Sequence, residues 1–290
     1  MTTTTAFEST APPPLRFARL DPERRLGLNS GYGTSPSVLS TLLLTLTLAF
    51  LIYTPAWLFR DTDAGSSVWH ALTAYQRIPV AITLTTCCAA AILILKWLKI
   101  RCQRRSLQVS LLPEDPDFRI DGRNVDRVLA RIAEQIDEPE QFILSNRMDR
   151  VLRNVRNVGR VADIDEMFTS AADADESRME SSYTVIRGLV WAIPVLGFIG
   201  TIVGLTMAIG EFQGVLDASG GEKMALVTEL GKVIAGLQTA FVTTGEGLVA
   251  ALVLQLGMVV IRRGDETLLD DIRDHCTIQV LSLVRLEARE

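Results

Sequence analysis

Several polar side chains interrupt two long apolar stretches in the second half of this chain, and six of them are candidates for an ion path. They are Thr201 in the first stretch and Thr239, Thr243, Thr244, Glu246 and Gln255 in the second. Hydroxyl and carboxyl oxygens can pass a proton or hold a hard cation, and an ionisable group inside an apolar stretch is costly unless it has a function. The chemistry that these residue types allow is the movement of an ion along a polar path.

The elements that carry these side chains must be membrane-spanning helices. Residues 189–209 contain no charged residue, and residues 233–261 contain only Glu246. Each stretch is as long as the ~20 residues that an α-helix needs to cross a bilayer. Two further uncharged stretches, residues 36–59 and 78–95, bring the predicted number of membrane helices to four.

Small residues recur at three- and four-residue steps in both of the later stretches, which gathers them on one side of each helix. The first set is Pro194, Gly197, Gly200 and Gly204, around Thr201, and the second is Gly236, Ala240, Gly247 and Ala251, around Thr244. Small residues allow close packing of membrane helices. Two matched sets with central threonines also fit a guarded polar path or a slot for another helix. The sequence leaves both interpretations open.

At these residues the chain resembles the MotA/TolQ/ExbB family of ion-conducting stator and energiser subunits. Residues 197–204, Gly-Phe-Ile-Gly-Thr-Ile-Val-Gly, are similar to that family's G-x-x-G-T-x-x-G segment, and residues 236–251 are similar to its final-helix pattern. The resemblance covers roughly residues 187–263. It implies a proton channel subunit that forms a homo-oligomer, expected to be a pentamer. It also implies that Thr201 and Thr244 occupy the positions of the pore threonines.

The resemblance further implies a partner. In the family, the ring surrounds the transmembrane helices of a MotB/TolR/ExbD-like single-span subunit dimer, whose aspartate carries the proton or sodium ion. Four membrane helices are similar to the flagellar stator branch, whereas the final-helix pattern is closer to the energiser branch. The expected function is coupling of ion flow to mechanical work, and the alternative is a non-conducting structural scaffold whose glycine faces only pack.

Glu246 departs from the family pattern. The energiser branch often has a glutamate five residues before the second threonine, where this chain has Thr239. On a helical projection Glu246 lies close to Thr239, so it can replace the missing acid one to two turns along. The other interpretation is a structural carboxyl at a subunit interface, bonded to Thr239, Thr243 or a backbone carbonyl.

Basic residues near the helix ends predict that both termini are cytoplasmic, because short positively charged loops stay on that side. The residues are Arg16, Arg19, Arg24 and Arg25 before the first helix, Lys96, Lys99, Arg101, Arg104 and Arg105 after the second, and Arg262 and Arg263 after the fourth. Trp57, Trp69 and Tyr75 are expected to anchor the outer interface in the lipid headgroups. The expected location is a bacterial inner membrane.

The predicted fold is all-α and polytopic, and the chain divides into five parts. These are a flexible cytoplasmic tail (1–35), peripheral transmembrane helices (36–100), a helical cytoplasmic module (101–183), the channel domain (184–263) and a helical cytoplasmic extension (264–290). Within the tail, residues 15–28 could form a short amphipathic helix along the membrane. In the module, Val125, Val128, Leu129, Ile132 and Ile136 recur at helical spacing, as do Val151, Leu152, Val155 and Val158. Breaks are expected near Pro113, Pro116 and Pro139.

Four arginines step by three residues through the module, namely Arg147, Arg150, Arg153 and Arg156. They predict either a docking surface for a partner or acidic lipid headgroups, or a solvated face with Arg–Asp pairs between neighbouring subunits. The net charge of −5 and the isoelectric point near 5.3 argue against nucleic-acid binding.

Catalytic and metal-binding patterns are missing from the sequence. The 290 residues include two histidines and four cysteines, without a helical His pair, a Cys-x-x-Cys motif or a phosphate-binding loop. His275 and Cys276 are adjacent, but two ligands make a poor metal site. We therefore expect no enzyme activity, no cofactor and no metal, and four reduced cysteines that serve packing.

Overall fold

The computed structural model describes residues 15–25, 27–62, 65–66, 69, 72–73, 77–109, 119–120, 124–155, 161–218, 223–280 and 283. Chain contacts divide the protein into two compact units. The membrane unit comprises residues 35–97 and 178–265, and the module unit comprises residues 1–34, 98–177 and 266–290.

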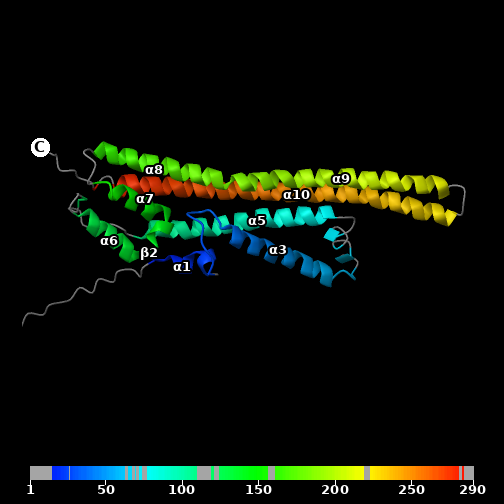
Figure 1. The fold of residues 1–290 in the computed structure, drawn as a ribbon, viewed down its shortest axis with the longest axis horizontal. Helices are drawn as coiled ribbons and strands as arrows, with labels where there is room; N and C mark the ends of the chain where they lie inside the picture. The colour runs from blue at the N-terminus through cyan, green and yellow to red at the C-terminus, as the bar shows by residue number, and fades with distance from the viewer. Residues whose placement is uncertain are drawn as a thin grey trace, which may run out of the picture. The chain divides into compact units, whose positions relative to one another are not determined.

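Four helices are long and apolar enough to cross a membrane, which confirms the predicted all-α polytopic fold. They are α3 (Val38–Leu58), α5 (Arg77–Arg104), α9 (Thr184–Ala218) and α10 (Lys223–His275). Figure 1 shows α9 and α10 side by side along their length, with α3 next to α5. Helix α3 lies within its predicted apolar stretch, and α5, α9 and α10 each extend beyond theirs.

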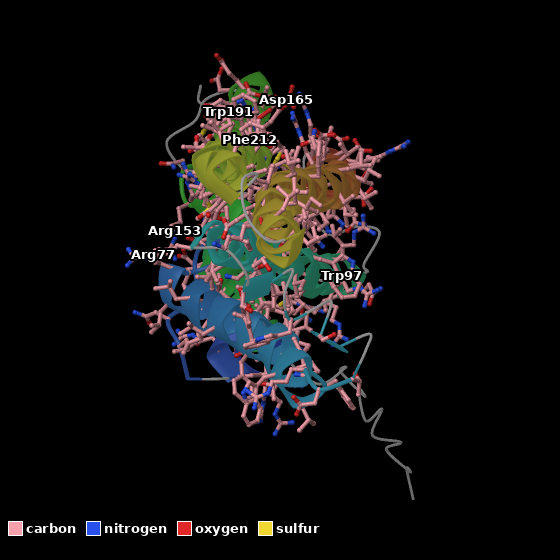
Figure 2. All side chains as sticks on the ribbon, turned by 90° about the vertical axis from the view of Figure 1, so that its right-hand side faces the viewer. Arg77, Trp97, Arg153, Asp165, Trp191 and Phe212 are labelled. Carbon is pink, nitrogen blue, oxygen red and sulfur yellow. The ribbon has the colours of Figure 1, made fainter. Side chains whose placement is uncertain are left out.

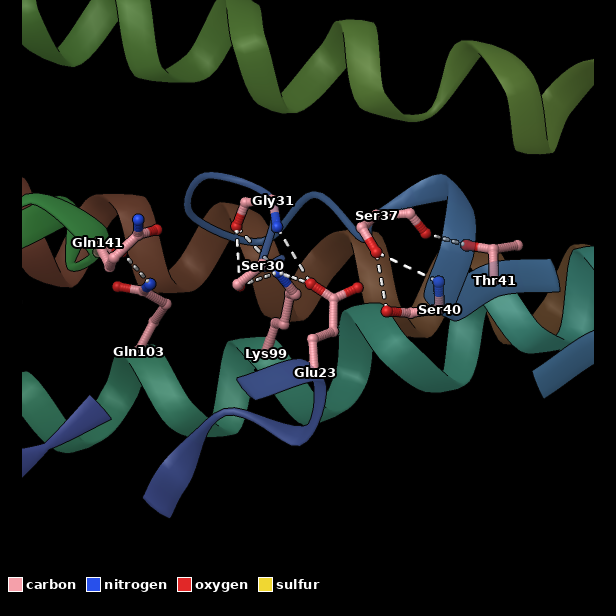
Figure 3. Close-up of polar contacts among 9 residues, drawn as sticks. All are labelled: Glu23, Ser30, Gly31, Ser37, Ser40, Thr41, Lys99, Gln103 and Gln141. Carbon is pink, nitrogen blue, oxygen red and sulfur yellow. Dashed lines mark hydrogen bonds and ion pairs between the residues drawn. The ribbon is translucent and has the colours of Figure 1, made fainter. Parts of the chain in front are cut away.

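The start of α3 is capped by a serine. Ser37 accepts a hydrogen bond from the backbone N–H of Ser40, and Thr41 Oγ1 donates to the Ser37 carbonyl (Figure 3). One face of α3 is buried and small, with Thr41, Thr45, Ala49 and Ala56. These small residues allow α3 to approach its neighbours closely.

The base of the membrane unit contains a buried ion pair between two helices. Lys96 Nζ of α5 lies 3.0 Å from Asp265 Oδ2 of α10, and both side chains are almost completely buried. Tyr183, just before α9, donates its hydroxyl to the same carboxylate oxygen at 3.1 Å, and Lys96 lies 4.1 Å from the centre of the Tyr183 ring. This cluster joins α5, α10 and the beginning of α9.

Large apolar side chains cover the outside of α9 and α10. Trp191 and Phe212, labelled in Figure 2, are exposed, as are Phe198, Phe241 and Leu252. Exposed apolar surface of this extent suits lipid or other protein chains.

The module unit is helical, with one short strand pair. Its elements are α6 (Val125–Gln135), α7 (Ile143–Leu152), the first part of α8 (Val161–Ser182), and the short helices α1 (Phe17–Leu20), α2 (Pro22–Arg25), η1 (Arg105–Gln108) and η2 (Pro139–Gln141). Val125, Val128, Ile132, Ile136 and Val155 are buried, as their spacing predicts. Pro139 lies in the break between α6 and α7, at the start of η2, whereas Pro113, Pro116 and Val158 lie outside the described residues.

Residues 15–34 differ from the flexible tail and the membrane-surface helix that the sequence predicts. Strand β1 (Leu15–Arg16) pairs in parallel with β2 (Ile136–Asp137), and Phe17 packs edge-on against Phe142 with ring centres 5.2 Å apart. Glu23 forms a buried ion pair with Lys99 at 2.7 Å, and Lys99 also donates to Ser30 and Gly31 (Figure 3). A polar composition suggested disorder, but long-range pairs fix this segment. Residues 1–14 lie outside the described part.

Helix α10 continues well past its apolar core, as predicted. It ends at His275 and is followed by a π-helical turn, Cys276–Val280. Its buried stripe is formed by Leu268, Ile272, Cys276 and Val280. The extension belongs to the module unit, where it contributes to the core.

Candidate functional site

The glycine-rich faces of α9 and α10 contact each other within one chain. A Cβ atom on Gly204 would lie 2.7 Å from the Gly236 carbonyl oxygen, and one on Gly247 would lie 3.0 Å from the Ile193 carbonyl oxygen. A Cβ on Gly197 would lie 3.0 Å from the Thr243 carbonyl, and one on Gly200 would collide with the Thr243 side chain. Side chains larger than hydrogen cannot fit at these positions, so the glycines set the distance between the helices.

Thr201 and Thr244 meet at the centre of this helix pair. Their hydroxyl oxygens are in direct hydrogen-bond contact. Thr244 Oγ1 also lies 3.1 Å from the Gly197 carbonyl and 3.0 Å from the Ala240 carbonyl, and Thr201 Oγ1 lies 3.3 Å from the Ala240 carbonyl. Two hydroxyl and two carbonyl oxygens thus gather between two apolar helices. Such oxygens can coordinate a hard cation or relay a proton.

The neighbouring threonines of α10 bond to their own helix. Thr239 donates to the Ala235 carbonyl and Thr243 to the Thr239 carbonyl, each at 2.9 Å. Both side chains are buried, which leaves their hydroxyl hydrogens internally satisfied. Gln255, in contrast, is exposed on the outside of α10. The predicted polar residues therefore lie in different environments.

Glu246 faces a helix that the sequence did not connect with it. Its Oε1 atom lies 3.1 Å from Thr83 Oγ1 of α5, and no hydrogen bond joins it to Thr239 or Thr243. Within the single chain, the hydrogen-bonded partner of Glu246 is therefore Thr83, and both interpretations of its role stay predictions. Thr83 was missed because only its hydroxyl, in an otherwise apolar stretch, marks it, and 163 residues separate the pair.

The four module arginines do not share one surface. Arg147 is buried and donates from Nε and Nη2 to Asp175 of α8, at 3.1 and 2.8 Å. Arg150 and Arg153 are exposed, and Arg156 lies outside the described residues. A three-residue step drifts by ~300° around a helix, so successive positions move from the core to the surface. Because it is buried, Arg147 does not belong to the predicted docking surface.

The surface near Arg150 and Arg153 is a cleft of mixed charge. It has a volume of about 840 Å³, lies between α7 and α8, and is lined also by Asp149, Asp163 and Glu166. Arg153 donates to Asp149 at 2.6 Å, and this hydrogen bond raises the pKa of Arg153. Three carboxylates beside two guanidinium groups favour pairing within the subunit over binding of acidic headgroups.

The described residues contain neither a disulfide bond nor a metal-binding group that would add to the candidate site. Cys87, Cys88, Cys102 and Cys276 are free thiols, and three of them are buried. No group of three metal-binding side chains occurs in the part of the chain that the structure describes.

Comparison with known proteins gives one family match. A model of the MotA/TolQ/ExbB proton channel family matches residues 135–274, a range that contains α7, α8, α9 and almost all of α10. Comparisons with curated proteins and with solved structures find no match. The matched range includes both glycine faces and the Thr201–Thr244 pair. Over residues 135–274, this multi-pass membrane chain matches the MotA/TolQ/ExbB proton channel family.

Proposed function

We propose that this chain is the ring-forming subunit of an ion-driven stator or energiser complex in a bacterial inner membrane, with both termini in the cytoplasm. The family that it matches consists of ion-channel stator and energiser subunits. Several copies, expected to be five, would place their α9–α10 pairs around a central slot. The exposed apolar residues of these helices supply surface for contacts between copies and with lipid.

The observation that carries the proposal is the Thr201–Thr244 hydroxyl pair. Both side chains are only half-buried in the single chain, although they lie between membrane helices. Hydroxyls can exchange donor and acceptor roles by rotation, so the pair can receive an ion from one side and release it to the other. The Gly197 and Ala240 carbonyls would replace part of the ion's hydration shell.

The proposed path needs a partner. Around the Thr201–Thr244 pair, the polar atoms that bond across the α9–α10 contact are hydroxyls and backbone carbonyls. The charged residues of this contact lie about three turns away, where Glu229 borders Gly214 and Lys232 Nζ lies 3.9 Å from Glu211 Oε2. Hydroxyls do not titrate near neutral pH, so a net charge must be carried by another group. An aspartate on a MotB/TolR/ExbD-like single-span subunit is the expected carrier.

The alternative is a structural scaffold, which is favoured by one observation. The glycine faces are already covered by each other within the chain, so they need no partner to be buried. A scaffold, however, gives no reason for a hydroxyl pair between two apolar helices, where alanines would pack as well.

Purification of the tagged chain from its native membranes separates the two functions. The proposal predicts co-purification of a single-span protein that has an aspartate in its membrane helix and a domain outside the membrane. Recovery of the chain in stable oligomers without such a protein, under conditions that retain other membrane complexes, would support the scaffold.

A further inference from the structure

Glu246 lies on the side of α10 away from the threonine pair. Glu246 follows Thr244 by two residues, or about 200° around the helix. Three contacts show that α10 packs against α5 on that side. Glu246 contacts Thr83, and Asp265 contacts Lys96. Between them, Gly257 faces Leu93: a Cβ added at Gly257 would lie 3.7 Å from Leu93 Cδ1. The contacts advance in the same order along both helices, so α5 and α10 run in parallel. Helix α10 therefore lies between α9 and α5.

The number of hydrogens at Thr83 constrains the protonation of Glu246. Thr83 Oγ1 lies 2.9 Å from the Pro79 carbonyl oxygen and 3.1 Å from Glu246 Oε1. A threonine hydroxyl has one hydrogen, and both of these neighbours are acceptors if the carboxyl group is ionised. Only one of them could then be fully bonded. If Glu246 carries a proton, its O–H donates to Thr83 and Thr83 donates to Pro79, so both short distances are explained.

The surroundings of Glu246 also favour the neutral acid. Glu246 forms no salt bridge within the described part of the chain, and its Oε2 atom is buried without a hydrogen bond. An ionised carboxylate needs several donors or a cation to offset the loss of water, whereas a neutral acid needs far fewer.

We propose that Glu246 is a proton-binding site separate from the threonine pair, in which the protonated carboxyl donates to Thr83 and fastens α10 to α5. The chain of hydrogen bonds runs from Glu246 through the Thr83 hydroxyl to the Pro79 carbonyl. It holds the face of α10 opposite Thr244, so the proton sets the position of the helix that carries the threonine pair. The inference concerns one carboxyl group and does not rest on the proposed function.

Infrared spectroscopy of the purified, lipid-reconstituted protein at neutral pH tests the protonation directly. The difference spectrum of wild type minus Glu246→Gln should contain a carboxylic-acid C=O band that shifts in D₂O. Carboxylate bands in its place would overturn the proposal, whether they depend on sodium or not, because an ionised Glu246 cannot donate to Thr83.

Variants of α5 test the hydrogen-bonded partner. Thr83→Val removes the hydroxyl at nearly constant volume and should change the frequency of the Glu246 acid band, whereas Thr83→Ser should restore it. Thr86→Val is the matched control, since Thr86 is one turn along the same helix and has no hydrogen bond to Glu246. A band that Thr83→Val leaves unmoved, or that Thr86→Val moves equally, would contradict the assigned chain of bonds.

A measurement of ion flux distinguishes a Glu246 proton that stays in place from one that moves along the ion path. Glutamine retains an N–H donor for Thr83, so complexes with Glu246→Gln should keep wild-type flux if the proton stays in place. Loss of flux in an assembled Glu246→Gln complex would show that this proton moves, against the proposal. Absence of flux in wild type would instead count against the proposed function and would leave the infrared result standing.

Discussion

At the scale of single residues, sequence patterns identified the polar groups but not their partners. The spacing of Thr201 and Thr244 places each on a glycine-rich face, and these faces do meet. The same reasoning could not connect Glu246 with Thr83 or Arg147 with Asp175, because periodicity defines a face of a helix and says nothing about which distant helix covers it. Lys96 and Lys99 indicated only the orientation of the helices, and their burial in ion pairs with Asp265 and Glu23 did not follow from the sequence.

The threonine pair gives a prediction about ion flux. Valine at position 201 or 244 keeps the volume and removes a hydroxyl, so the assembled complex should lose about tenfold or more in flux, consistent with ~1–3 kcal/mol for an unmade hydrogen bond. Thr206→Val is the control, since Thr206 is exposed on α9 and bonds only to the Ile202 carbonyl of its own helix. Flux assays in liposomes should separate the variants, and equal flux in all three would remove the basis for this path.

The buried Arg147–Asp175 pair gives a prediction about stability. Arg147→Met removes two hydrogen bonds and a cation from the buried Asp175 carboxylate and should destabilise the module by roughly 3–5 kcal/mol, whereas a paired change to apolar residues at both positions should recover most of the loss. Arg150→Met, at an exposed position, is the control. Cys276 is buried close to both groups, so its rate of labelling by a thiol reagent reports opening of the core. Slow labelling in Arg147→Met would show that the pair is dispensable.

At the scale of secondary-structure elements, the sequence predicted more. Four membrane helices, the helices of the module and the extension of α10 follow from local composition and apolar periodicity, which need no knowledge of the partner surface. The packing of residues 15–34 did not follow, because it depends on pairs such as Glu23 with Lys99 and Phe17 with Phe142 that join distant segments. Elements are thus predicted better than their associations.

The close approach of α9 and α10 gives a prediction about two glycines of one helix. Gly204→Ala adds a Cβ 2.7 Å from backbone atoms of α10 and should destabilise the membrane unit by roughly 1–3 kcal/mol. Gly210→Ala has open space around its Cβ and should be neutral or slightly stabilising, since alanine favours a helix over glycine. Thermal unfolding in detergent compares the two. Equal midpoint temperatures for the two variants would mean that an added Cβ at position 204 separates the helices without loss of stability.

At the scale of the whole molecule, the account requires several copies of the chain. The half-buried threonine pair and the exposed apolar residues of α9 and α10 leave surface that a single chain does not cover. Native mass spectrometry of the detergent-solubilised protein should therefore give a particle of at least three chains, with five expected. A particle of one or two chains under mild extraction would exclude a ring.

The central claim is that an ion path forms only when this chain surrounds a partner that carries the titratable group. The most direct measurement is proton or sodium flux in liposomes under an imposed membrane potential, for the co-purified complex, for the complex with the partner's membrane aspartate changed to asparagine, and for the isolated chain. The account predicts flux in the first preparation and background flux in the other two. Flux through the isolated chain equal to that of the complex, or no flux in any preparation, would contradict it.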